Sequence, residues 1–184
     1  MELESSLLAQ RVVDSPVGPL RLVADRHAVR ALRFADPHEP RPTPSGLPSV
    51  APRAALRLID RLERELRDYF AGRRREFTVP LAARGTPFQE RVWGALRSIP
   101  YGMTATYGDV ARTIGVPAAA RAIGGANNQN PIAIVIPCHR VIGADARLVG
   151  YAPGLDKKVQ LLQLEGALPA TGRERAVAAS VRHG

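Results

Sequence analysis

Apolar and polar residues alternate along the first part of the chain in the pattern typical of half-buried β-strands. Three short stretches carry apolar residues in this way, at residues 12–13, 20–24 and 28–34. Residues 16–19 and residues 25–27 are rich in turn formers and separate these stretches. The pattern predicts a small antiparallel sheet of three strands.

The pattern then changes to that of a helix. Six prolines between Pro37 and Pro52 exclude a helix there and predict an extended loop over residues 36–52. Over residues 54–70 apolar side chains recur at helical spacing, with charged residues between them. We interpret the charged face of this helix as a solvated surface. The strands and the helix together predict an N-terminal α/β domain over residues 1–80.

A mostly helical C-terminal domain is predicted over residues 85–166. Thr86 is a favourable N-cap in front of Pro87, and the helix that they start extends to about Ser98. The residues of this helix expected to face the core are Val92, Trp93 and Leu96. Beyond this domain, we expect residues 167–184 to be disordered or a loosely packed helix.

Residues 107–127 have the pattern of a helix-turn-helix. A short helix over residues 107–114 is followed by a Gly-Val-Pro turn at residues 115–117 and a second helix over residues 118–127. Many helical hairpins share this pattern, so by itself it is weak evidence for DNA binding.

The second helix of this pair is almost bare of long side chains. Its small residues are Ala118, Ala119, Ala120, Ala122, Gly124, Gly125 and Ala126. A helix that distinguishes base edges needs long polar side chains, whereas a bare helix lets its backbone enter a narrow groove in any sequence context. Arg121 is the one long side chain on this surface. It is either a phosphate contact or a finger that fills the space left by an extruded nucleotide.

The only cysteine of the chain, Cys138, follows a run of apolar residues. We expect residues 132–136 to form a short, fully buried strand that Pro137 ends, so that Cys138 sits at the end of a rigid element. His139 and Arg140 come next, and a nearby cation favours the reactive thiolate. The alternative is that Cys138 is a small buried hydrophobic residue.

Charge and cysteine content narrow the possible functions. The chain has 26 basic and 17 acidic residues, a formal net charge of +9, which suits a polyanionic partner such as nucleic acid. One cysteine excludes an intramolecular disulfide and a multi-cysteine zinc site. The sequence contains no apolar run of membrane-spanning length and no basic signal-peptide region at its start, so we expect a soluble, cytoplasmic protein.

The segment around Cys138 resembles a known active site. Residues 121–131, followed by Pro-Cys-His-Arg-Val at 137–141, are similar to the active-site region of the O6-alkylguanine-DNA alkyltransferases, also called methylated-DNA–protein-cysteine methyltransferases. The resemblance covers roughly residues 11–34 and 66–166. Its further motifs are residues 86–93, 99–102, 106–111, 150–151 and 161–166.

The resemblance implies roles for individual residues. Cys138 would be the nucleophile, and His139 would draw its proton through a bridging water. Residue spacing alone leaves Asp145, Asp156 and Glu165 open as the carboxylate that orients His139, and the resemblance selects Glu165. The other implied roles are proton donation to the purine by Tyr107, minor-groove contact by Ala119, Ala120, Ala122, Gly124 and Tyr107, intercalation by Arg121, a hinge at Asn130, and a base pocket formed by Tyr151 and the backbone of Cys138, Val141 and Ala152.

The function implied by the resemblance is DNA repair by direct reversal. Cys138 would take the alkyl group from O6-alkylguanine in double-stranded DNA, with O4-alkylthymine as a second substrate, once per molecule and without cofactor or metal. One alternative is a non-catalytic alkyltransferase-like DNA-binding protein, in which a tryptophan replaces the nucleophile. Another is a hydrolase with a Cys/His/Glu triad, which would need an oxyanion hole. We expect a monomer.

One position departs from the family pattern. The family usually has glycine two residues after the pocket tyrosine, where this chain has Pro153 after Tyr151-Ala152. Proline fixes one φ angle and removes a hydrogen-bond donor. We expect a stiffer pocket lip that narrows the range of bulky adducts.

Overall fold

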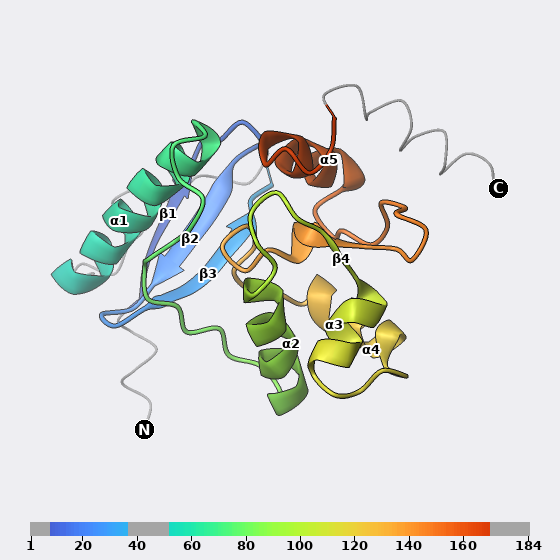
Figure 1. The fold of residues 1–184 in the computed structure, drawn as a ribbon. Helices are drawn as coiled ribbons and strands as arrows, with labels where there is room; N and C mark the ends of the chain where they lie inside the picture. The colour runs from blue at the N-terminus through green and yellow to red at the C-terminus, as the bar shows by residue number, and fades with distance from the viewer. Residues whose placement is uncertain (1–7, 37–51, 170–184) are drawn as a thin grey trace. The chain divides into compact units, whose positions relative to one another are not determined.

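The computed structural model describes residues 8–36 and 52–169 (Figure 1). Most of the predicted proline-rich loop and residues 170–184 of the predicted tail lie outside the described residues. Among the helices that are described, none is long and apolar enough to cross a membrane.

The chain forms two compact units. Of the described residues, the first unit contains those up to Arg84 together with Pro131–Val135, and the second contains Gly85–Asn130 and those from Ile136 onward. The first unit therefore includes a short segment that lies far along the sequence from the rest of it.

The first unit is built on the predicted three-stranded sheet. Strands β1 (Ala9–Val13), β2 (Leu20–Ala24) and β3 (Val29–Phe34) pair antiparallel in the order β1-β2-β3. The fully buried side chains of β2 alternate along the strand: Leu20, Leu22 and Ala24. This alternation is the period-two pattern that the sequence predicted, and the prediction is confirmed.

Helix α1 (Arg53–Phe70) packs on this sheet against β1 and β2 (Figure 1). Its core-facing residues include Ala55, Ile59, Leu62, Leu66 and Tyr69, so the predicted amphipathic helix is confirmed. Glu65 is also buried, and its carboxylate accepts hydrogen bonds from the backbone N–H of Thr78 at 2.9 Å and the Thr78 hydroxyl at 2.7 Å. This acid therefore holds the segment after α1 against the helix.

The apolar run before Cys138 is not the strand that we predicted. Its first residues run beside β3, where Ile132 forms an isolated parallel bridge with Leu32. The chain then turns sharply: Ile134 has a φ of +71°, and the N–H of Val135 donates to the carbonyl of Ala133 at 2.8 Å. Such a three-residue turn ends any strand. The side chains are buried as expected, but burial alone does not distinguish a strand from a compact turn.

The second unit begins with three helices. They are α2 (Pro87–Arg97), α3 (Tyr107–Thr113) and α4 (Ala120–Asn128). Thr86 and Thr106 cap α2 and α3, and each forms a capping box with the third residue of its helix. The predicted helix-turn-helix is therefore present, although its second helix starts two residues later than expected, because residues 118 and 119 belong to the turn.

Short elements around Cys138 complete the second unit. Cys138–Arg140 form a 3-10 helix, η3, which leads directly into β5 (Val141–Ile142), and α5 (Leu155–Leu164) packs against η3. Strand β5 pairs in parallel with β4 (Ala105–Thr106), which precedes α3. This pairing ties the start of α3 to the segment that follows the cysteine. The predicted fold class, a small α/β part and a mostly helical part with a helix-turn-helix, is confirmed.

Candidate active site

Cys138 is the first residue of η3, and it is buried, with 5 % of its surface exposed. Burial raises the pKa of its thiol, because a thiolate loses hydration in the interior. Four groups lower this pKa: the side chain of Asn130, which hydrogen-bonds to the thiol, the charge of Lys158, and hydrogen bonds from the backbone of Cys138 and His139. The cysteine is thus held protonated at rest, in surroundings that partly offset the cost of ionising it.

Two asparagines hold the backbone around the cysteine. Nδ2 of Asn130 donates to the carbonyl of Ile136 at 2.8 Å, and Nδ2 of Asn127 donates to the carbonyl of Cys138 at 3.4 Å. The hydrogen bond from Asn130 therefore joins the two ends of the segment at residues 131–135, which ends shortly before Cys138. Our sequence analysis singled out Asn130 but missed Asn127, whose place in the bare helix gave no signal.

His139 and Glu165 are brought together, although 26 residues separate them. Nε2 of His139 lies 2.9 Å from Oε1 of Glu165, and both side chains are fully buried. Because a carboxylate accepts, Nε2 carries the proton and Nδ1 is left as the acceptor nitrogen. Nδ1 is buried and forms no hydrogen bond within the part of the chain that the structure describes. Asp145 and Asp156, the alternatives by spacing, form ion pairs with Arg147 and Lys157.

Burial lowers the pKa of His139 and outweighs the opposite effect of Glu165. The imidazole is therefore neutral at neutral pH and available to accept a proton. The carboxylate partner opposes this effect, so it stabilises the imidazolium once the proton arrives.

Arg140 faces Glu165. Its Nε donates to Oε2 at 2.8 Å, its Nη2 donates to Oε1 at 2.9 Å, and its Nη1 donates to the carbonyl of Ile99 at 2.6 Å. This carboxylate therefore balances much of the charge of the guanidinium that we expected to favour the thiolate. The backbone N–H of Gly102 adds a longer hydrogen bond to Oε2 at 3.4 Å. The carboxylate is thus fixed from several sides.

Tyr107, the first residue of α3, contacts the loop at residues 143–150. Its hydroxyl donates to the carbonyls of Val149 at 3.4 Å and Gly150 at 3.3 Å. Gly150 has a φ of +59°, and a Cβ there would lie 2.7 Å from the Tyr107 hydroxyl. A side chain at this position would be strained and would force the Tyr107 ring to move, so the close approach favours glycine. Burial, and then the charge of Cys138, raise the pKa of the Tyr107 phenol, so it stays a proton donor.

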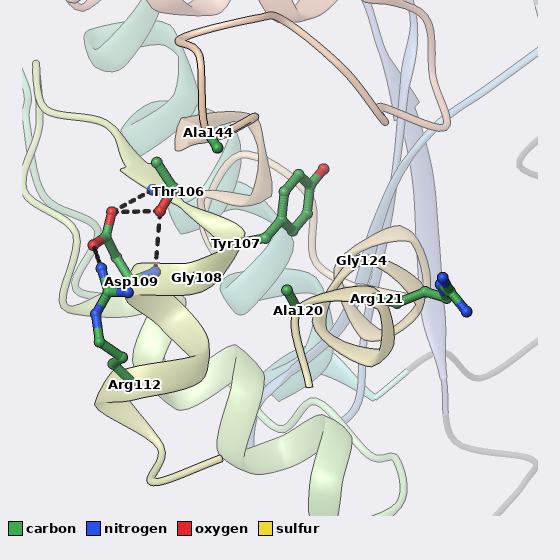
Figure 2. Close-up of a pocket in the computed structure, with 9 residues that line it drawn as sticks. All are labelled: Thr106, Tyr107, Gly108, Asp109, Arg112, Ala120, Arg121, Gly124 and Ala144. Carbon is green, nitrogen blue, oxygen red and sulfur yellow. Dashed lines mark hydrogen bonds and ion pairs between the residues drawn. The ribbon is translucent and has the colours of Figure 1, made fainter. Parts of the chain in front are cut away.

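A cleft of about 740 Å³ opens between α3, α4 and this loop. Figure 2 shows Tyr107 projecting between Ala144 and α4, with Asp109 and Arg112 on one side and the Arg121 side chain extending outward on the other. Apart from Arg121, the exposed or half-buried residues at the start of α4 are small, as predicted: Ala120, Ala122 and Gly124, with Ala119 as the N-cap of the helix.

The residues predicted to surround the base lie in the same unit. Tyr151 is 7 % exposed, Val141 is fully buried, and Ala152 is exposed. Burial, and then the charge of Cys138, raise the pKa of Tyr151 well above its usual value. The structure thus gathers both tyrosines, Val141 and Asn130 around the cysteine segment.

Lys158 is a residue that sequence analysis missed. It is fully buried on α5, and its Nζ donates to the carbonyls of Val141 at 2.5 Å and Val149 at 2.7 Å. A lysine in a charged stretch at the start of a helix is usually a surface residue, so its sequence carried no signal. Within residues 8–36 and 52–169, no group of His, Cys, Asp and Glu is placed to hold a metal ion.

Comparison with known proteins places this geometry in a family. Residues 8–83 match the ribonuclease-like domain of 6-O-methylguanine DNA methyltransferase, and residues 87–167 match its DNA-binding domain. A Methanosarcina acetivorans protein named methylated-DNA–protein-cysteine methyltransferase is 47 % identical over 156 residues, which cover 85 % of this chain and 97 % of that protein.

Solved structures agree with this match. The crystal structure of Mycobacterium tuberculosis O6-methylguanine methyltransferase has a TM-score of 0.73 and 44 % identity, covering 89 % of this chain and 96 % of that chain. The Mycobacterium tuberculosis OGT structure in complex with DNA has a TM-score of 0.71 and 46 % identity, covering 88 % and 95 %. The two domain matches together span most of the chain, and the chain belongs to the 6-O-methylguanine DNA methyltransferase family.

Proposed function

We propose that this protein repairs DNA by direct reversal, transferring the alkyl group from O6 of guanine to its own Cys138. The observation that carries the proposal is the cysteine beside a neutral histidine, whose far nitrogen is held by the buried carboxylate of Glu165. This constellation lies in the unit that matches the DNA-binding domain of the family. A non-catalytic DNA-binding protein would have no use for it.

The reaction is a direct displacement at carbon. The Cys138 thiolate attacks the alkyl carbon, a carbon–sulfur bond forms, and the bond from that carbon to O6 breaks with its electron pair on the oxygen. The thiol loses one proton and the departing guanine gains one, so the reaction is balanced in protons. Because a thioether is not hydrolysed under cellular conditions, each molecule reacts once.

Activation of the thiol requires a base, since burial keeps the thiol protonated. His139 offers Nδ1 as an acceptor, because Nε2 is engaged by Glu165. As a sequence neighbour of Cys138, it would receive the proton through one bridging water. Glu165 then stabilises the imidazolium, and Arg140 keeps the carboxylate in place.

Tyr107 would serve as the proton donor to the purine. Its raised pKa keeps the phenol protonated, and its position in the cleft suits this role (Figure 2). Its hydroxyl would exchange its long hydrogen bonds to the loop carbonyls for one to the base. Tyr151 and the backbone of Cys138, Val141 and Ala152 would enclose that base.

DNA would bind across α4 through the minor groove, because its small residues allow close approach of the backbone. Arg121, exposed beside the cleft, would enter the base stack after the damaged nucleotide leaves it. We expect a monomer to suffice and the cytoplasm to be the place of action, since the single thiol must stay reduced. O4-alkylthymine is a second substrate, and Pro153 restricts bulky adducts.

Mass spectrometry of the intact protein after mixing with O6-methylguanine duplex tests the proposal. The expected result is a gain of one methyl group on Cys138 and recovery of unmodified guanine. The control is Cys138→Ser, which should bind the duplex almost as well as wild type without gaining mass. An unmodified wild-type protein, or hydrolysed product without protein modification, would refute the proposal.

A further inference from the structure

Lys158 is a buried charge that donates its hydrogen bonds to backbone carbonyls. No part of its surface is exposed, and its ammonium donates to Val141 at 2.5 Å and Val149 at 2.7 Å. Among the residues that the structure describes, no carboxylate forms an ion pair with it. Burying an ammonium without a counter-ion is costly, so a merely structural position would favour an uncharged residue.

The two carbonyls belong to segments that meet at the site. Val141 directly follows the 3-10 helix that contains Cys138, and Val149 belongs to the 143–150 loop that Tyr107 contacts. The carbonyl of Val149 therefore accepts from both Lys158 and Tyr107. The ammonium thus links the segment of the nucleophile to the loop that borders the cleft.

The charge of Lys158 also acts on the sulfur. Burial lowers the pKa of Lys158 to about 8, and the charge of Cys138 acts to raise it. The effect is mutual, because Lys158 lowers the pKa of the thiol. Of the other titratable groups here, burial favours neutral His139 and protonated Tyr107 and Tyr151.

The remaining cation at the site does not compete for this role. Arg140 is paired with Glu165 through two hydrogen bonds, whereas Lys158 has no carboxylate partner among the described residues. Lys158 is therefore the cation whose charge is left to balance a thiolate at Cys138.

We propose that Lys158 is a positioning residue of the alkyl transfer, whose ammonium stabilises the Cys138 thiolate by charge while it ties the 143–150 loop to the segment of the nucleophile. This inference rests on the proposed function for its role in repair, but the charge coupling itself does not depend on DNA. When Cys138 becomes a neutral thioether, the ammonium loses the charge that it balances. The coupling is therefore expected to vanish after the reaction.

The first test uses the wild-type protein and its two lysines, Lys157 and Lys158. Carbon-13 labelling of lysine gives two Cε signals, which Lys157→Arg assigns. The pKa values of the two lysines are measured before and after Cys138 is blocked with methyl methanethiosulfonate. In the blocking reaction the Cys138 thiolate attacks the sulfenyl sulfur of the reagent, a disulfide forms, and methanesulfinate leaves. The pKa of Lys158 should fall on blocking, and that of Lys157 should not move. An unchanged pKa of Lys158 would overturn the proposal.

The second test compares Lys158→Met with the matched control Lys157→Met, which removes the same charge from the adjacent, half-buried residue. The rate of Cys138 with the same reagent is followed against pH. Lys158→Met should move the pH profile of the rate to higher pH. If the thiol pKa rises by about one, the reaction at neutral pH becomes about tenfold slower. At high pH the rate of the variant should equal that of wild type. Lys157→Met should match wild type throughout, and Lys158→Arg should restore part of the lost rate at neutral pH.

A loss by the same factor at every pH would show that Lys158 does not act by charge and would overturn the proposal. If Lys158→Met fails to fold, the lysine titration of the wild-type protein decides. Neither measurement uses DNA. Failure of the methyl-transfer experiment with normal lysine coupling would therefore refute the repair function alone, and the reverse result would refute only the role of Lys158.

Discussion

Arg140 grips the carboxylate of Glu165 through two side-by-side hydrogen bonds, from Nε to Oε2 at 2.8 Å and from Nη2 to Oε1 at 2.9 Å. Oε1 also accepts from His139, so one oxygen serves both the guanidinium and the imidazole. A fork of this kind fixes the plane of the carboxylate as well as its position. The orientation of the imidazole therefore depends on Arg140, which acts on it through the shared carboxylate.

Replacing Arg140 with Met should destabilise the protein strongly. The change leaves a buried carboxylate without its main partner, which costs roughly 3–5 kcal/mol in proteins. The free energy of unfolding from urea denaturation measures the effect. The control is Arg147→Met, which breaks the exposed pair with Asp145 and should cost at most about 1 kcal/mol. Equal losses for the two variants would contradict the structural role of Arg140.

Gly150→Ala should impair the site through Tyr107. The new Cβ would lie 2.7 Å from the Tyr107 hydroxyl, at a backbone φ of +59° that alanine disfavours by about 1 kcal/mol. Single-turnover transfer should slow severalfold or more, and Gly150→Ala combined with Tyr107→Phe should recover the stability lost to the clash. The control is Gly94→Ala, where α2 has open space for a Cβ and where alanine should stabilise by roughly 0.5–1 kcal/mol. An unchanged transfer rate and stability in Gly150→Ala would mean that the loop does not keep its contact with the Tyr107 hydroxyl.

The sheet, α1 and α2 could be predicted because local sequence dictates them. The alternation along β2 and the Thr86 capping box are signals that lie within a few residues of the element they specify. The turn at Ile134 could not be predicted in this way. A run of β-branched residues favours a strand locally, whereas the bridge of Ile132 to Leu32 depends on a part of the chain that is distant in the sequence.

The site was predictable only in part for the same reason. Cys138 and His139 are recognisable by their motif, whereas the choice of Glu165 over Asp145 needed either a family resemblance or the fold. Arg140 was identified, but its partner was not, since the pairing spans 25 residues. Lys158 was missed because burial of a charged side chain is a property of the packed structure and not of its sequence neighbours.

Arg121→Ala should slow repair of alkylated duplex much more than reaction with free O6-benzylguanine. The free base needs no extrusion, so only the duplex reaction depends on a side chain that fills the vacated stack. Single-turnover rates on both substrates measure the difference. Arg112→Ala is the control, because Arg112 also lines the cleft but is paired with Asp109. If Arg121→Ala slowed the reactions with both substrates equally, Arg121 would belong to the base pocket, and its proposed insertion into the base stack would be refuted.

Glu165→Gln should weaken activation of Cys138 in a pH-dependent way. The amide keeps the size of the side chain but lacks the charge that raises the pKa of His139, so the imidazolium formed during activation becomes less stable. At neutral pH the thiol is protonated because burial raises its pKa, and transfer should therefore slow in the variant. As the pH rises toward the thiol pKa, thiolate forms without the relay, and part of the lost rate should return. Single-turnover transfer from methylated duplex across the pH range, for wild type, Glu165→Gln and His139→Phe, measures this.

The control is Asp145→Asn, which changes an exposed acid that residue spacing alone also allowed as the partner of His139, and it should behave as wild type. Three identical profiles for wild type, Glu165→Gln and His139→Phe would mean that the thiolate forms without the relay, and the two residues would then have structural roles only.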